Sequence, residues 1–266
     1  MAPAIFDPTT LDPTTLDSGE AQQPAASIHS HAGAAFFCQQ LAAHGFLEQG
    51  FSERFPPKIL VAGCGSGHEA IAIQDRLDAD VDAVDVEDFV DSNYHAQTRT
   101  RFQVASVCEL PFEDGRFDAI FYHHVIEHVD HPFESLAELT RVLRPGGWLF
   151  IGTPNRHRLI SSIGAHRQSE WEATFYNKLC DNLRDWKDRF TGKFRNELGA
   201  HAGFSRGELD RMLAKHFQHR EWLTSQYLQF KYGKSSAANL LSIATHPAIA
   251  WFAAPSIYAM CQRPVG

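Results

Sequence analysis

The chain has 266 residues, of which 44% are hydrophobic and 21% charged, an ordinary balance for a soluble globular protein. Its net charge is −8 and no basic stripe is evident, which argues against a nucleic acid partner. Five cysteines lie singly, without a disulfide framework or a metal-ligand spacing, so we predict a reducing, cytoplasmic setting and no metal site. There is no secretory signal and no run of residues that could span a membrane.

The N-terminal segment repeats D-P-T-T-L, at residues 7–11 and again at 12–16. Proline, threonine and acidic residues dominate, and their apolar surface is too small to offset the cost of ordering the chain. We therefore predict a disordered tail over residues 1–27 and one folded domain over 28–266.

A helix is predicted over residues 34–49, where apolar residues recur at helical spacing and Gly50 can end the helix. His31 lies just before it and could approach a ligand. A solvated histidine near a helix start is the more common interpretation.

The stretch that organises the chain is an apolar run at residues 59–62 followed by Gly63, Gly65 and Gly67. The run is typical of a strand buried in a parallel sheet. Glycine allows a sharp turn and a close approach of the backbone to a ligand. Helical spacing resumes at residues 70–73, so backbone N–H groups at a helix start would face that ligand. A tight turn without a ligand is the weaker alternative.

A second apolar strand, residues 81–85, ends on Asp85. An acid about twenty residues beyond a glycine turn is placed to bind ribose hydroxyls. The dinucleotide pattern G-x-G-x-x-G is not met, because the third glycine comes one place early and His68 stands where glycine is expected. The pattern therefore favours an adenosine over a dinucleotide, and argues against a nicotinamide oxidoreductase.

Further motifs follow in a recognisable order: A-G-C-G-S-G-H-E at 62–69, A-V-D at 83–85, L-P-F-E-D-G-R-F-D-A-I at 110–120, V-I-E-H-V at 125–129, L-T-R-V-L-R-P-G-G at 139–147 and G-T-P-N at 152–155. Together they resemble the class I S-adenosylmethionine-dependent methyltransferases. The likeness covers residues 36–217 and is greatest to the broad small-molecule group that includes ubiquinone-pathway enzymes.

This resemblance implies an α/β fold: a doubly wound, mostly parallel, seven-stranded Rossmann-like sheet with an antiparallel last strand and a helical cap insertion at 156–202. The expected strands are residues 59–62, 81–85, 101–105, 117–122, 148–151, 221–230 and 256–262. Residues 86–100 are polar and weakly periodic, so the helix expected there is stunted. Two helix starts are marked locally, by Pro132 after His131 and by a capping box of Ser205 and Glu208 in a helix running to His216.

The resemblance also implies S-adenosylmethionine as cofactor. Val86 would lie under the adenine, and Glu87 or Asp88 could share the ribose with Asp85. Ser106 stands where the family often has an aspartate beside the adenine amino group, and a hydroxyl accepts more weakly than a carboxylate. The implied cofactor-binding residues are Ala62, Gly63, Cys64, Gly65, Gly67, Asp85, Val86, Ser106, Val107 and His123.

His123 and His124 follow the fourth strand, at the sheet edge where α/β proteins bind ligands. Either is a candidate catalytic base, and His124 is weakly favoured. His124-x-x-Glu127-His128 also matches an inverted zinc-peptidase motif, which would make the chain a zinc hydrolase. That motif needs a helix, whereas a strand leads directly into it, so the methyltransferase pattern is the better explanation and Glu127 and His128 would brace the loop.

The acceptor is not specified by the sequence. Aromatic residues in the 156–202 insertion and the absence of a basic groove favour a small, partly apolar acceptor, with oxygen as one candidate nucleophile. A non-catalytic S-adenosylmethionine-binding protein remains the alternative. The apolar stretch 236–255 could be a lid, a homodimer contact, a lipid-like acceptor surface or, most simply, part of the core.

Overall fold

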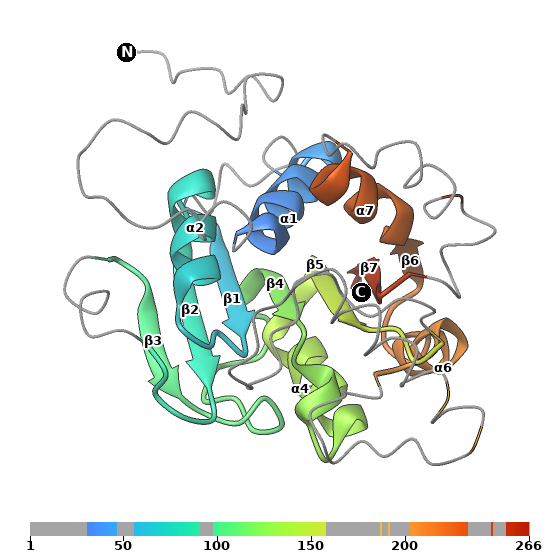
Figure 1. Ribbon diagram of the computed structural model, residues 1–266. Coiled ribbons are helices and arrows are strands. Elements are labelled where there is room, and N and C mark those ends of the chain that lie inside the picture. Colours follow the sequence, from blue (N-terminus) through green and yellow to red (C-terminus); the bar gives the residue numbers. More distant parts are fainter. Residues whose placement is uncertain are drawn as a thin grey trace, which may run out of the picture.

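The structure is a computed structural model that describes residues 31–46, 56–90, 98–157, 203–233 and 254–265, with Lys187, Thr191 and His246. Its strands form one seven-stranded sheet in the order β3-β2-β1-β4-β5-β7-β6 (Figure 1). β1 to β5 pair in parallel, and β7 runs antiparallel to both of its neighbours, which confirms the predicted fold class. The strands are β1 (Lys58–Ala62), β2 (Asp80–Asp85), β3 (Arg101–Val104), β4 (Phe117–His123), β5 (Leu143–Pro154), β6 (His219–Trp222) and β7 (Ser256–Gln262).

Helices cover both faces of this sheet (Figure 1). One face carries α1 (Ala32–Ala43), α2 (His68–Leu77) and α7 (Thr224–Tyr232), and the other carries α4 (Pro132–Val142) and α6 (Arg206–Leu213). A hydrophobic core lies on each face of the sheet, because successive side chains of a strand point to opposite faces. β4 is an example. Phe121 packs with α1 and α2, while Ile120 packs with α4 and α6.

The parallel strands bring their carboxyl ends to one edge of the sheet. The glycine turn after β1, Asp85 at the end of β2 and His123 at the end of β4 therefore share this edge. Open α/β sheets bind ligands at this edge.

The strand predicted over residues 221–230 is wrong beyond Trp222. β6 ends there, and the chain continues as α7. The N–H of Tyr227 donates to the carbonyl of Leu223, and both side chains are buried in the same core cluster. A backbone bond from residue i to residue i−4 is the bond of an α-helix, whereas a strand would bond to a neighbouring strand.

Several element boundaries also differ from prediction. α1 ends at Ala43 instead of near Gln49, because Gly45 takes a left-handed conformation with φ of 66° and breaks the helix earlier. α6 ends at Leu213 instead of His216. β5 begins at Leu143, five residues before the predicted start.

Both local helix signals are confirmed. Pro132 opens α4. Ser205 caps α6, accepting the Glu208 N–H while the Glu208 carboxylate accepts the N–H of Ser205. The described parts of the polar stretch, residues 86–90 and 98–100, hold no helix, and residues 91–97 lie outside the described residues, so the stunted helix stays a prediction.

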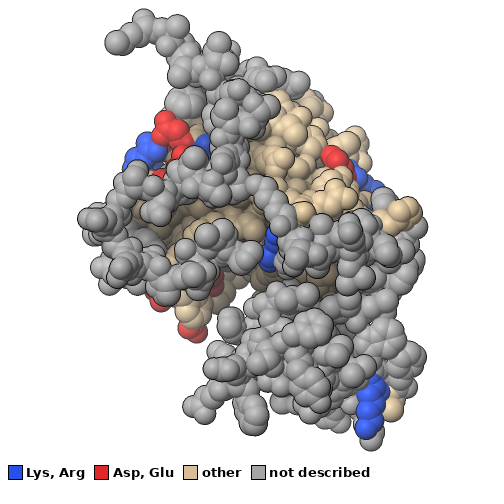
Figure 2. Space-filling view, turned by 45° about the horizontal axis from the view of Figure 1, so that its top comes forward, with Lys and Arg blue, Asp and Glu red and all other residues tan. Residues whose placement is uncertain are grey.

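The tail at residues 1–27, nearly all of the cap insertion and nearly all of the apolar stretch 236–255 lie outside the described residues. What the sequence predicts for them, a dimer contact included, stays a prediction. Among the described helices, none combines the length and the apolar character needed to cross a membrane. On the face shown in Figure 2, the described charged residues form small separate groups of either sign.

Candidate active site

The glycine turn joins β1 to α2 through three left-handed residues. Gly63, Gly65 and Gly67 have φ angles of 77°, 48° and 85°, which other residues adopt only at a cost. A Cβ on Gly63 would lie 2.2 Å from Cγ2 of Val125, so packing alone requires glycine there. A Cβ on Gly65 would meet no described heavy atom within 4 Å. Gly65 therefore borders open space, as a ligand cradle requires.

The Asp85 carboxylate faces this turn, as predicted. Its Oδ2 accepts the N–H of Gly65 at 2.8 Å, and its Oδ1 accepts the N–H of Val86 at 2.8 Å. Each oxygen keeps a further lone pair that can accept a hydrogen bond. The geometry thus combines a fixed turn with an acceptor for sugar hydroxyls.

The remaining predicted cofactor residues divide into exposed and buried ones. The Val86 side chain is 63% exposed, which leaves an apolar surface available beside Asp85. Ser106 is exposed, and its Oγ accepts the N–H of Cys108 at 3.2 Å, so the hydroxyl hydrogen can still be donated. The side chains of Ala62 and Val107 are buried in the core, so only their backbone atoms can take part in binding.

Cys64 lies in the turn itself. Burial, together with the neighbouring Asp85 carboxylate, raises the pKa of the Cys64 thiol to about 12. The thiol therefore stays protonated near neutral pH, and the thiolate form that acts as a nucleophile is scarce.

His123 is held by a carboxylate that the sequence analysis did not assign. Its Nδ1 lies 3.2 Å from Oε2 of Glu69, in the first turn of α2. Burial raises the pKa of Glu69, but His123 and His124 outweigh that effect and hold it below its usual value. The Nε2 of His123 is buried without a hydrogen-bond partner among the described residues.

His124 forms a second histidine–carboxylate pair. Its Nδ1 lies 3.3 Å from Oε1 of Glu127, and its Nε2 lies 3.4 Å from the hydroxyl of Tyr258. Glu127 is fixed in turn by the Thr153 hydroxyl, which donates to Oε2 at 3.0 Å. Burial and the nearby His123 lower the pKa of His124, despite the opposing effect of Glu127. His124 is therefore neutral near pH 7 and available to accept a proton.

The backbone at His124 is unusual. Its φ of 56° lies in the left-handed region, which few residues other than glycine adopt, although asparagine, aspartate and histidine do so more often than the rest. Strain of this kind persists where the surrounding structure fixes the residue, and it is frequent at functional sites. Here the Glu127 and Tyr258 contacts fix the ring.

The zinc-hydrolase alternative gains no support. The sequence H-x-x-E-H begins directly after β4 and ends in a short 3-10 turn, η3 (Ile126–His128), instead of lying on an α-helix. Glu127 binds His124 directly, and the group of described side chains close enough to share a metal ion does not include the residues of this motif.

Three site residues were missed or misjudged from sequence. Glu69 follows the glycine turn, but nothing in its neighbours indicates that it turns towards His123. Tyr258 lies 134 residues from its partner His124. His31 is not the solvated residue expected, because its Nδ1 is buried and its ring stacks on His68 with centroids 5.8 Å apart. Burial, with His68 adding to the effect, lowers the pKa of His31.

Comparison with known proteins gives the family. Residues 60–151 match the family described as "Methyltransferase domain". Residues 60–151 form a class I S-adenosylmethionine-dependent methyltransferase domain. This methyltransferase segment contains the glycine turn, Asp85 and both site histidines.

Named relatives share this segment. Tocopherol O-methyltransferase of Arabidopsis thaliana is 30% identical over 131 residues, 46% of this chain and 37% of the relative. Ubiquinone biosynthesis O-methyltransferase of Xanthomonas campestris pv. campestris is 34% identical over 107 residues, 37% of this chain and 44% of the relative. The chain thus matches less than half the length of these relatives.

A solved structure supports the fold of this chain. The plantazolicin methyltransferase BpumL, solved with a triazolic desmethylPZN analog and SAH, aligns with a TM-score of 0.55 at 16% identity. The alignment covers 88% of this chain and 86% of that one. At this identity the likeness concerns the fold alone.

Proposed function

We propose that the chain transfers the methyl group of S-adenosylmethionine to a hydroxyl oxygen of a small, partly apolar acceptor. The cofactor assignment rests on the position of the Asp85 carboxylate, which accepts a hydrogen bond from the N–H of Gly65. Gly65 itself borders open space, which a Cβ at this position would enter. The three-glycine turn, the acid and the exposed Val86 fit an adenosine.

The chain's residues would hold the cofactor in a defined way. Asp85 accepts hydrogen bonds from the ribose hydroxyls, and Val86 lies under the adenine with Ser106 at its edge. When bound, S-adenosylmethionine supplies a methyl group activated by a positively charged sulfur, which leaves as a neutral thioether. The protein's main contribution is alignment of the nucleophile with the methyl carbon and the leaving sulfur.

His124 is the base in this proposal. A carboxylate only accepts, so Glu127 fixes the proton on Nδ1 and leaves a lone pair on Nε2. Nε2 of His124 would take the proton of the acceptor hydroxyl, whose oxygen would receive the methyl group that bound S-adenosylmethionine supplies. The contact from Nε2 to the Tyr258 hydroxyl is long, at 3.4 Å, and a substrate hydroxyl can replace it. The His124 side chain is 36% exposed against 11% for His123, which favours His124.

The aromatic surroundings support a partly apolar acceptor. The Tyr258 ring stacks on Tyr227 with centroids 3.9 Å apart and lies 5.9 Å from the ring of His123. The two relatives above are named as O-methyltransferases, one of tocopherol and one of ubiquinone biosynthesis, which favours oxygen as the nucleophile. Both observations are consistent with a phenol-like substrate.

Three measurements test the proposal. Calorimetry should show binding of S-adenosylmethionine and no heat with NAD. A panel of phenols, aliphatic alcohols, amines and thiols should then release S-adenosylhomocysteine with phenols fastest. His124→Gln should lower kcat by about 10²-fold or more, the usual range for losing a general base, while His123→Gln lowers it less. Binding without turnover of any acceptor would favour a non-catalytic binding protein, and no binding would reject the assignment.

A further inference from the structure

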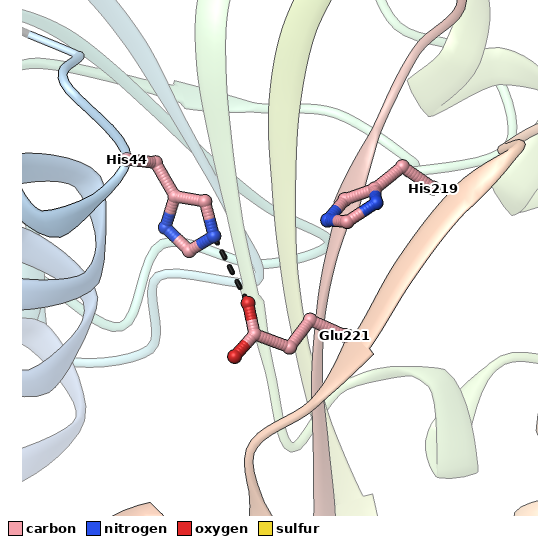
Figure 3. A group of neighbouring side chains, drawn as sticks. All are labelled: His44, His219 and Glu221. Atoms are coloured by element: carbon pink, nitrogen blue, oxygen red, sulfur yellow. Dashed lines mark hydrogen bonds and ion pairs between the residues drawn. The ribbon is translucent and has the colours of Figure 1, made fainter.

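A second polar cluster lies away from the candidate active site. His219 and Glu221 are two residues apart on β6, so their side chains leave the same face of the strand. His44 reaches them from the C-terminal end of α1. Figure 3 shows the three side chains pointing toward one another between the helix and the edge strand.

The contacts within this cluster place a ring nitrogen of His44 against the Glu221 carboxylate. The Nε2 of His44 lies 3.0 Å from Oε2 of Glu221, and its Nδ1 lies 2.7 Å from the carbonyl oxygen of Gln40. A carbonyl only accepts, so Nδ1 carries the hydrogen. In neutral His44 the lone pair of Nε2 would then face a carboxylate. That arrangement is stable only if a proton or a metal ion lies between the two atoms.

The surroundings orient both imidazoles. The ring of His44 lies 4.4 Å and that of His219 5.9 Å from the ring of Trp148. Among the described residues, His44 is the only ion-pair partner of Glu221. Arg220, between the two β6 ligands, turns to the other face and pairs with Asp210.

The cluster is separate from the methyl-transfer site. Trp148 on β5 lies next to it, whereas His123 pairs with Gly152 on the same strand. Four residues of β-strand span about 13 Å. A ligand here would therefore not contact the proposed base.

We propose that His44, His219 and Glu221 bind a divalent transition-metal ion of the zinc type. Their ligand atoms all lie within 4.8 Å of one another. Zinc holds nitrogen and oxygen ligands at about 2.0–2.2 Å, so the exposed His219 must turn slightly inward to complete the site. The hydrogen bond from His44 Nδ1 to a backbone carbonyl is the support that metal-binding histidines usually have. Water completes the coordination.

Such an ion would fasten α1 to β6. β6 is the edge strand of the sheet and is paired with β7 alone among the described strands. A ligand that binds the folded state only stabilises that state. No local sequence pattern could indicate this site, because 177 residues separate His44 from Glu221.

Zinc titration of the full, chelator-treated chain at pH 7.5 tests the proposal. Calorimetry should show one equivalent of Zn²⁺ bound at a site that His219→Asn and Glu221→Gln each weaken by at least about tenfold. Zinc should raise Tm in the unaltered chain and not in these variants. Co²⁺ in place of Zn²⁺ should give visible absorption bands that the same variants lose.

His131→Asn is the matched control. His131 also lies near a carboxylate, 3.9 Å from Glu134, but both are exposed and no third ligand lies beside them among the described residues. Its zinc affinity should equal that of the unaltered chain. Equal affinity in all variants would place any bound zinc elsewhere, and no heat at all would leave a proton between His44 and Glu221; either result overturns the proposal. Binding of S-adenosylmethionine should be unaffected by His219→Asn, so the two proposals fail separately.

Discussion

The Asp85 carboxylate accepts the N–H of Gly65 at 2.8 Å, across twenty residues of chain. This bond ties the end of β2 to the turn that follows β1. It fixes the carboxylate before any ligand arrives, so binding does not have to order it. The relationship gives the cofactor assignment its most direct test.

Replacing Asp85 by alanine should raise the Kd for S-adenosylmethionine at least about tenfold, since buried ribose hydroxyls would lose their acceptor. Calorimetry measures this directly. Asp80→Asn is the control, because Asp80 begins the same strand at the opposite edge of the sheet. An unchanged Kd in Asp85→Ala would remove Asp85 from the site.

Alanine at Gly63 and at Gly65 should have different effects. Gly63→Ala drives a methyl group into Val125 and should lower the free energy of unfolding by at least about 2 kcal/mol. Gly65→Ala meets open space, so it should cost only about 1 kcal/mol for its left-handed backbone. Its main effect should be weaker cofactor binding. Urea unfolding and calorimetry on both variants separate the two roles, and equal effects on both quantities would contradict them.

The pH dependence of kcat should report His124. A base works when unprotonated, and the pKa of His124 lies below its ordinary 6.5 because of burial and His123. Activity should therefore hold down to pH 6.5 and fall in more acidic solution. His123 lowers the pKa of His124 and Glu127 raises it, so His123→Gln should move this acid limb to higher pH and Glu127→Gln should move it lower. A limb centred above 6.5 would exclude His124 as the base.

Folding stability should change with pH in the same direction. The folded His124 has a lower pKa than the unfolded chain, so the unfolded state binds more protons in acid. Its contribution is therefore complete above pH 6.5 and is lost as the pH falls from there towards the folded-state pKa. Urea unfolding from pH 8 to 5, compared with His124→Gln, should show a smaller loss in the variant.

The capping box offers a test of the fold alone. Ser205→Ala should destabilise the protein by about 1 kcal/mol, because the Glu208 N–H loses its acceptor at the start of α6. Ser205→Thr should retain most of that stability. Cofactor affinity should be the same in both, and a change in it would link α6 to the site.

Local sequence patterns predicted the fold well because turns and helix starts are determined by a few neighbouring residues. The three glycines, Pro132 at the start of α4 and the Ser205 cap each act on their own neighbours. The strand prediction after β6 failed because this short segment has no clear hydrophobic period, so its sequence fits a strand as well as a helix. Only the packing of Tyr227 against α1 and Tyr258 selects the helix.

Sequence patterns could indicate site residues only where those residues lie next to a recognisable strand end. Asp85 and His124 come directly at or after a strand end, so the sequence could place them at the ligand-binding edge of the sheet, and their roles stay predictions. Glu69 and Tyr258 could not be placed there, because their roles depend on which way a helix turns and on a distant strand. No sequence-spacing pattern relates residues as far apart in the chain as His124 and Tyr258.

The placement of β7 has a consequence for how this protein is made. β7 lies between β5 and β6 in the sheet although it follows both in the chain. While a ribosome is still synthesising the chain, β6 has no neighbour to pair with until β7 emerges from the exit tunnel. Tyr258 arrives on that same strand. The nascent protein therefore acquires its edge strand and the hydroxyl beside His124 in one late step.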